Sequence, residues 1–337
     1  MKSQPDAVLK IEEDRMNRRS MNLLVAALPL ALAAPTVASA AWPERPISIV
    51  VPYAPGGTAD ALARLIAQHL GPKLGTSAVV VNKAGASGII GASSVAQANP
   101  DGYTVLYDAT PLSINPYLQK LPFDPQKDLA PVTLVAVTPM LLVVPKSSPY
   151  NSIQDVIKAA KASPGKLTFA SGGQGTVQYM GAELFNQGAG VKMLHVPYKS
   201  GGPGLMAIVG GEVDLGFGNL PALTGHVKNG LVKPLAITSG QRNPNFPEVP
   251  TIAESAVKGY ETYEWNGMFM PKGTPPEIVS RLQTAVKEVL AAPDVKAKFD
   301  ALGSRVVAST PDEFGKYLQG ESSKWAATVK TAGIKKE

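Results

Sequence analysis

Residues 47–60 read ISIVVPYAPGGTAD, and this stretch decides the fold. Its β-branched run at 47–51 predicts a buried strand, and the two adjacent glycines further on predict a turn. Apolar residues then recur at helical spacing over 61–70, so an amphipathic helix is expected after the turn, with a stop at Gly71-Pro72. Strand, glycine turn and helix in this order are typical of an α/β protein.

A second unit of the same kind lies further along the chain. Residues 166–170 predict a strand, residues 171–176 (SGGQGT) a glycine loop, and residues 177–187 a helix. Other strand candidates alternate with helical stretches between and after the two units, and this alternation predicts parallel sheets covered by helices on both faces. We therefore expect an α/β protein with two lobes, each built on a mostly parallel sheet.

The chain is expected to cross from one lobe to the other and back. A region rich in proline and aromatic residues, 243–274, is interpreted as a crossover that returns the chain to the first lobe. The first lobe is then formed by residues 41–143 and 264–337, and the second lobe by residues 144–263. We expect a monomer.

The amino-terminal 40 residues have the features of an export leader. Residues 16–40 contain a short cationic start, an apolar stretch and a closing Ala38-Ser39-Ala40. The apolar run at 23–34 is too short to span a membrane, which needs roughly 20 residues. We interpret residues 1–40 as leader and signal peptide, with Met16 as the true start, cleavage near Ala40 and the mature chain in the periplasm.

Composition and charge exclude several classes of site. The formal charge is +6 over 337 residues, but only 17% of residues are charged and the cations do not form runs, so nucleic acid is not an expected partner. The chain has no cysteine, which excludes disulfides and thiolate metal sites. Its three histidines, His69, His195 and His226, are far apart in the sequence, so we expect no metal and no cofactor.

The two glycine loops are the candidate binding elements. In α/β lobes ligands sit beyond the carboxyl ends of the strands, where glycines let several backbone N–H groups point at one anion in front of a helix N-terminus. Neither loop has the Lys-Ser/Thr of a phosphate-binding loop or the spacing of a dinucleotide fingerprint, so a carboxylate is the better match and a phosphate is the alternative ligand. The alternative is that each loop is only a tight turn from strand to helix.

Seven short motifs together carry a resemblance to a known family. They are WPERPI at 42–47, VPYAPGGTAD at 51–60, NKAGASG at 82–88, NPDGYT at 99–104, HVPYK at 195–199, GEVD at 211–214 and VPT at 249–251. In this order they resemble the Bug-type (Bordetella uptake gene) extracytoplasmic solute receptors, the TctC-like binding components of tripartite tricarboxylate transporters. The resemblance covers essentially the whole mature chain. It implies a two-lobed periplasmic binding protein fold of type II-like topology that captures a carboxylated solute between its lobes and delivers it to the membrane components of the transporter.

The resemblance also assigns ligand-binding residues. On the first loop and its helix these are Tyr53, Ala54, Gly56, Gly57, Thr58 and Asp60, and on the second loop they are Ser171, Gly175 and Thr176. Further candidates are Asn82, Thr138, Tyr198 and Asn219.

Some of these residues have a second interpretation. Thr58 is expected to cap the first helix; Asp60 places an anion in its first turn and either caps the helix or orients ligand-bound water. Tyr198 alternatively packs in the core. Asp108 departs from the family pattern, and we expect it to repel a second carboxylate, favouring a monoacid or an amino acid.

Two other functions remain as alternatives. A receptor that docks on a periplasmic sensor domain would have the same binding site. A periplasmic hydrolase would need a nucleophile with a base, and Ser171 lacks the glycine two residues before it that a nucleophile elbow requires. His195 alone is an insufficient partner, so we expect no enzyme.

Overall fold

The structure is a computed structural model that describes residues 42–336. The signal peptide predicted for residues 1–40, its cleavage near Ala40 and the start at Met16 lie outside the described residues. Within residues 42–336, no helix combines the length and apolar character needed to cross a lipid bilayer.

Strands and helices alternate along most of the described chain, as the α/β prediction requires. The strands are β1 (Ile47–Val51), β2 (Ala78–Asn82), β3 (Thr104–Ala109), β4 (Leu129–Pro145), β5 (Thr168–Ser171), β6 (Leu194–Pro197), β7 (Leu215–Asn219), β8 (Val232–Ile237), β9 (Tyr263–Pro271) and β10 (Arg305–Val306). The helices are α2 (Thr58–Leu74), the 3-10 turn η1 (Ala86–Gly88), α3 (Ile89–Ala96), α4 (Pro111–Leu118), α5 (Pro125–Asp128), α6 (Ile153–Ala162), α7 (Val177–Ala189), α8 (Gly201–Gly210), α9 (Leu220–Lys228), α10 (Ile252–Ser255), α11 (Pro276–Leu290), α12 (Pro293–Ala301) and α13 (Pro311–Ala332).

The helix after the first loop differs from the prediction at both ends. Gly57 is the N-cap residue and no side chain caps α2, so the predicted Thr58 cap is wrong, whereas Asp60 does lie in the first turn. The predicted stop is also wrong, because α2 continues through Pro72 and ends at Gly75, whose left-handed φ of +71° terminates it. A proline in the last turn removes one intrahelical hydrogen bond, and burial of Leu74 in the core offsets that loss.

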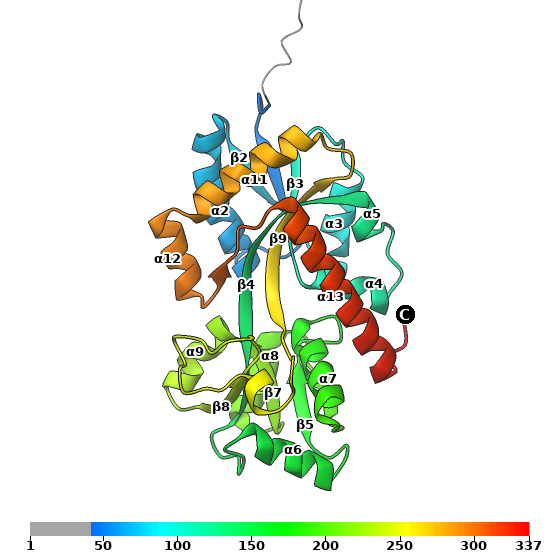
Figure 1. Ribbon diagram of the computed structural model, residues 1–337, viewed down its shortest axis with the longest axis vertical. Coiled ribbons are helices and arrows are strands. Elements are labelled where there is room, and N and C mark those ends of the chain that lie inside the picture. Colours follow the sequence, from blue (N-terminus) through cyan, green and yellow to red (C-terminus); the bar gives the residue numbers. More distant parts are fainter. Residues whose placement is uncertain (1–41, 337) are drawn as a thin grey trace, which may run out of the picture. The chain divides into compact units, whose positions relative to one another are not determined.

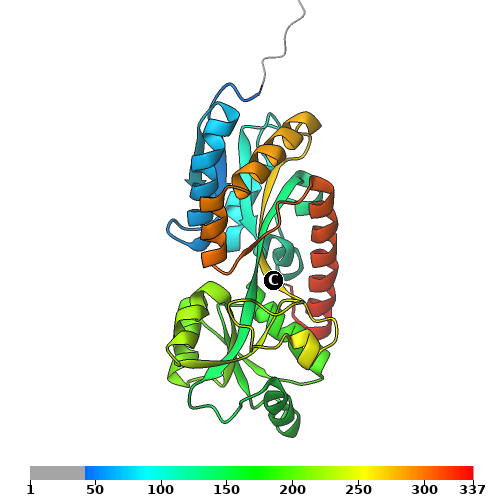
Figure 2. The same ribbon diagram turned by 60° about the vertical axis from the view of Figure 1, so that its left-hand side comes forward.

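The first sheet is covered by helices on both faces. β1 pairs in parallel with β2 and β3, and β9 lies between β3 and β4 in antiparallel pairing. Because side chains alternate along a strand, Ile49 and Val51 join the core under α2 and α11, while Val50 joins the core under α3 and α13. Figure 2 shows α2 and α12 on one side of β4 and α13 on the other.

The second sheet has the strand order β4-β7-β5-β6, with β8 also paired to β4. β5 pairs in parallel with β6 and β7. Phe169 of β5 packs in one core with residues of α6 and α7, and the next residue, Ala170, packs in another core with residues of α8 and α9. Both faces of this sheet are therefore buried as well.

One strand belongs to both sheets. The 17-residue β4 pairs with β9 over its first part and with β7 and β8 over its second part. Figure 1 shows β4 and β9 side by side along this connection. The α/β class is confirmed, but β4, β8, β9 and β10 add antiparallel pairs to the predicted parallel ones. Hydrophobic runs reveal that a strand is buried and carry no information about its direction, which is why these pairs were not predicted.

The last helix contributes to two cores. Phe314, near the start of α13, packs with Trp265 and Phe269 of β9. Trp325, three turns later, packs in the core that also contains Phe169 of β5. Figure 1 shows α13 extending from beside β9 towards α7.

Candidate functional site

Asp60 braces the first glycine loop, residues 52–57, at the carboxyl end of β1. The Asp60 carboxylate, which is 4% exposed, accepts hydrogen bonds from Arg64 Nε at 3.0 Å, Gly56 N–H at 3.0 Å and Asn82 Nδ2 at 2.9 Å. The hydrogen bond from Arg64, followed by that from Gly56, lowers the pKa of Asp60 to about 2. Asp60 is thus an ionised support for the loop backbone.

Asn82 and Arg64 complete this support. Asn82 Nδ2 also donates to the Tyr53 carbonyl oxygen at 3.1 Å, and Asn82 Oδ1 accepts from Arg64 Nη2 at 2.9 Å. The amide of Asn82 therefore ties the end of β2 to the loop after β1. Arg64 was missed by sequence reasoning, although its spacing of four residues from Asp60 on a helix was a usable signal.

The loop leaves a set of backbone donors free. Within residues 42–336, the N–H groups of Gly57, Thr58 and Ala59 have no hydrogen-bond acceptor, and Gly57 and Thr58 are exposed. Ala54 is also exposed on this loop. Gly56 has a φ of +85°, a left-handed conformation that glycine adopts without strain, and this turn aims the following N–H groups beyond the helix end. Free N–H groups at the start of a 17-residue helix attract an anion.

Beside this loop lies a buried carboxyl group. Asp108, at 1% exposure, accepts from the Tyr53 hydroxyl at 2.7 Å and from the Ala109 N–H at 2.7 Å. Burial raises the pKa of Asp108 to about 7, although both hydrogen bonds act in the opposite direction. Tyr53 is therefore held in place by a carboxyl group that titrates near neutral pH.

The second glycine loop is held by side chains from its own lobe. Ser171 Oγ lies 2.7 Å from His195 Nε2 and accepts from the Gly173 N–H at 3.1 Å. Thr176 is the N-cap of α7: its Oγ1 accepts from the Tyr179 N–H and donates to the Gly173 carbonyl oxygen at 2.7 Å. In the described part of the chain, the N–H groups of Gln174 and Gly175 have no acceptor.

A polar chain links the second lobe to β9. Asn219, the N-cap of α9, accepts from Gln178 Nε2 at 3.0 Å and donates through Nδ2 to the Glu264 carboxylate. Burial raises the pKa of Glu264, and the hydrogen bond from Asn219 opposes this shift. Glu264 also raises the pKa of Tyr53 electrostatically, after the larger effects of burial and of Asp108. The Glu264 carboxyl group therefore interacts with Asn219 of the second lobe and with Tyr53 of the first.

A cavity of about 460 Å³ joins residues of the two lobes. Its lining residues are Ser87, Asn115, Leu118 and Gln119 from one side, and Gln174, Gly175, His195 and Pro197 from the other. Of the predicted ligand-binding residues only Gly175 lines it. Ser87, Asn115 and Gln174 were missed, because a single polar residue in a loop or helix carries no signal of which cavity it faces. A smaller cavity of about 160 Å³ lies next to Ser171 and Asn219 within the second lobe.

Two predicted residues have structural contacts. Thr138 Oγ1 lies 2.7 Å from Ser304 Oγ, and this pair links β4 to the residue before β10. The ring of Tyr198 packs against the core that contains Ala170, which is the alternative interpretation given for it above. Burial raises the pKa of Tyr198, and Glu212 adds to the shift.

A metal site and a catalytic triad each require a particular arrangement of side chains. Over the described residues, no group of three or more histidine and carboxylate side chains is placed to hold a metal ion. Ser171 and His195 do form a pair, but across residues 42–336 no carboxylate hydrogen bonds to the His195 ring. Burial lowers the pKa of His195, as expected for a ring that stacks on Phe169 and packs at a tilt against Tyr179.

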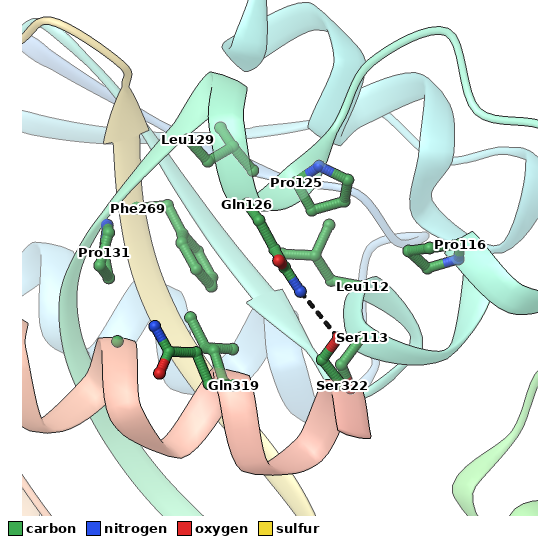
Figure 3. A pocket seen from close by; sticks show the side chains of 12 residues that line it. Leu112, Ser113, Pro116, Pro125, Gln126, Leu129, Pro131, Phe269, Gln319 and Ser322 are labelled. Carbon is green, nitrogen blue, oxygen red and sulfur yellow. Dashed lines mark hydrogen bonds between the residues drawn. The ribbon is translucent and has the colours of Figure 1, made fainter. Parts of the chain in front are cut away.

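A separate cavity lies away from both glycine loops. Its volume is about 290 Å³, and apolar residues of α4, β4, β9 and α13, including Leu112, Leu129, Phe269 and Leu318, line much of it. Figure 3 shows this cavity with Gln126 Nε2 hydrogen bonded to Ser322 Oγ. None of the predicted ligand-binding residues lines it.

Comparison with known proteins places the chain in a family. The family model described as tripartite tricarboxylate transporter family receptor matches residues 62–334. The structure of the periplasmic binding protein BugD is 35% identical, covers 88% of this chain and 100% of its own, and superposes with a TM-score of 0.74. Rpa4515 of R. palustris, solved with adipate, is 37% identical with coverages of 88% and 100% and a TM-score of 0.77. MatC (Rpa3494) from Rhodopseudomonas palustris, with bound malate, is 32% identical with coverages of 86% and 100% and a TM-score of 0.72.

These similarities confirm the resemblance seen in the sequence and the two-lobed periplasmic binding protein fold. The similar proteins are solute-binding proteins and not enzymes, which agrees with the expected absence of catalysis. The chain belongs to the tripartite tricarboxylate transporter receptor family and is a periplasmic solute-binding receptor of the Bug and TctC type.

Proposed function

We propose that this receptor closes its two lobes on a small carboxylate-containing solute, holds the carboxylate through backbone N–H groups of both glycine loops, and delivers the solute to the membrane components of a tripartite tricarboxylate-type transporter. The observation that carries the proposal is the set of N–H groups of Gly57, Thr58 and Ala59 at the start of α2, which have no acceptor among the described residues. Asp60 holds the loop without using these three donors, so they are preorganised for an anion.

The class of ligand follows from the donors and from the relatives. Neither loop contains Lys or Arg, so the binding groups are neutral N–H donors, which suit a carboxylate. Two solved relatives carry adipate and malate, both of which are carboxylates. We expect the same chemical class here.

We also propose lobe boundaries, an oligomeric state, an export leader and a membrane partner for the receptor. We place the first lobe at residues 41–143 and 264–337 and the second lobe at 144–263. β4 leaves the first sheet for the second after Pro139, and β9 lies in the first sheet, which supports a first lobe built from two segments of the chain. We propose that the receptor acts as a monomer and that residues 1–40 are its export leader. The family description supports a transporter as the partner.

Two glycine substitutions test the binding loops. A Cβ at Gly57 would lie 3.8 Å from the Ala54 carbonyl oxygen, and one at Gly175 would lie 3.6 Å from Asn115 Oδ1, both ordinary contacts. Gly57→Val and Gly175→Val should therefore fold while their side chains cover the N–H donors. In a thermal-shift panel of mono-, di- and tricarboxylates, a ligand at a hundred times its Kd should stabilise the unmodified receptor by about 2.7 kcal/mol.

Both variants should lose this shift and keep the melting temperature of the unliganded protein. Gly225→Val is the matched control, because Gly225 lies in α9 outside both loops and a Cβ there meets no neighbour within 4 Å. If Gly57→Val and Gly175→Val both retained the full shift, the loops would not be the site.

A further inference from the structure

Asn115 carries a buried amide with one unused oxygen. Asn115 of α4 is 3% exposed, and its Nδ2 donates to the Ser87 carbonyl oxygen at 3.0 Å. Its Oδ1 is buried and has no hydrogen-bond partner anywhere in residues 42–336. Rotating the amide by 180° would set Oδ1 against the Ser87 carbonyl oxygen, two acceptors facing each other, so the orientation is fixed. Buried polar atoms are nearly always paired, which makes this acceptor conspicuous.

Asn115 Oδ1 faces the opposite lobe. It is the nearest atom to the position that a Gly175 Cβ would take, at 3.6 Å, and Asn115 lines the cavity of about 460 Å³ described above. Asn115 and the second glycine loop thus line the same cavity, and the Gln174 and Gly175 N–H groups of that loop are also without acceptors in the described chain.

The backbone that holds Asn115 in this position is itself unusual. Ala86 and Ser87 have left-handed φ values of +47° and +53°, which L residues rarely adopt. The hydrogen bond from Asn115 Nδ2 to Ser87 stabilises that conformation. Ser87 also lines the cavity, so the left-handed segment and the amide are presented together.

The cavity carries no formal charge. None of its lining residues is Asp, Glu, Lys or Arg. Burial lowers the pKa of His195, which keeps that ring neutral near pH 7. A ligand carboxylate finds no cation in this cavity, and an ammonium finds no anion. A neutral group that donates a hydrogen bond is the chemistry that an unpaired amide oxygen accepts.

We propose that this cavity is a subsite for an uncharged hydrogen-bond donor, a hydroxyl or amide N–H, on the solute whose carboxylate is held by the glycine loops, and that Asn115 Oδ1 accepts its hydrogen bond. The inference rests on the proposed function and narrows its ligand class to hydroxylated or amide-bearing carboxylates. Asn115 becomes a specificity-determining residue.

Matched acid pairs that differ by one hydroxyl test the subsite. Isothermal titration calorimetry on the exported receptor would compare malate with succinate, 2-hydroxyglutarate with glutarate, 4-hydroxybutyrate with butyrate and 6-hydroxyhexanoate with hexanoate. At least one hydroxylated acid should bind about threefold to tenfold more tightly than its deoxy partner, the range expected for one neutral hydrogen bond. Equal affinity within every pair would overturn the subsite, while leaving the carboxylate receptor intact. Absence of binding by any acid would instead remove the proposed function as well.

Two substitutions separate the acceptor role of Asn115 Oδ1 from the support that Asn115 Nδ2 gives to Ser87. Asn115→Leu removes the acceptor and the Nδ2 donor, whereas Asn115→Asp removes the donor and keeps an oxygen acceptor. Asn115→Leu should abolish the preference for the hydroxylated acid with little change for its deoxy partner, and Asn115→Asp should keep the preference. If Asn115→Leu weakened both members of a pair equally, Asn115 would be only a structural support and the proposal would fail.

Discussion

At the residue scale, the most consequential groups are two aspartates with opposite surroundings. Asp60 is ionised and saturated with donors, so it supports the first loop. Asp108 is buried, accepts from two donors and forms no ion pair within the described residues, so its charged form is costly. The two carboxyl groups lie on either side of Tyr53, because Asn82 connects Asp60 to the Tyr53 carbonyl oxygen and the Tyr53 hydroxyl donates to Asp108.

Asp108 should make the stability of the receptor depend on pH. Its pKa is about 7 in the folded chain and near its ordinary value of 3.8 in the unfolded chain. Between these values the folded state holds a proton that the unfolded state has released, so the free energy of unfolding falls as pH rises through this window. Asp108→Asn keeps an acceptor for the Tyr53 hydroxyl and removes the titration.

The variant should therefore gain stability relative to the unmodified receptor as pH rises from 4 to 7, with a constant difference above that. Urea denaturation of both proteins at pH 4, 6 and 8 measures this difference in the free energy of unfolding. A difference that does not change with pH would show that Asp108 is not titrating in the folded chain.

At the element scale, the close packing of β9 against α13 sets the position of the last helix. A Cβ on Gly267 of β9 would lie 2.2 Å from the Phe314 ring, a distance that real side chains do not tolerate. Phe314 is fully buried and packs edge-on against Trp265 and at a tilt against Phe269, so the ring cannot move away freely. The absence of a side chain at Gly267 is thus what allows α13 to lie on the sheet.

Gly267→Ala should lower the free energy of unfolding by about 1 to 3 kcal/mol through overpacking. The control is Gly320→Ala on α13, where a Cβ meets nothing within 4 Å, and which should stabilise by about 0.4 to 1 kcal/mol. Chemical denaturation of both variants measures the change in the free energy of unfolding, which should be a decrease for Gly267→Ala and an increase for Gly320→Ala. If Gly267→Ala left the free energy of unfolding unchanged, β9 and α13 would be able to move apart at little cost.

At the scale of the whole described chain, β4 and α13 couple the two lobes. β4 carries ladder hydrogen bonds in both sheets, and α13 buries Phe314 in one core and Trp325 in another. Because these elements are continuous, loss of one core removes support from the other. We therefore expect a single cooperative unfolding transition.

Trp325→Ala should reveal this coupling. The side chain is fully buried and its Nε1 donates to the Glu321 carboxylate at 3.1 Å, so truncation should cost about 3 to 5 kcal/mol. Calorimetry should show one transition in the unmodified receptor, shifted to lower temperature in the variant. Two resolved transitions in the unmodified protein would contradict the coupling.

The sequence by itself determined the α/β class, the two strand–loop–helix units and the family. These features depend on local patterns: the β-branched run at 47–51, the glycine loops and the ordered motifs from 42 to 251. Periodicity and backbone freedom are properties of neighbouring residues, so they can be interpreted without coordinates. The prediction failed first at element ends, as at Pro72, where burial of one more turn outweighed a local stop signal.

Only the tertiary structure decided which residues meet. Arg64 and Asn82 share the bracing of the first loop with Asp60, and Asn115 of α4 faces Gly175 of the opposite lobe. The antiparallel course of β4 and β9 sets these encounters, and that course depends on how the chain returns between lobes. A contact between distant residues is a consequence of strand register and chain direction, and neither is encoded in the residues immediately around it.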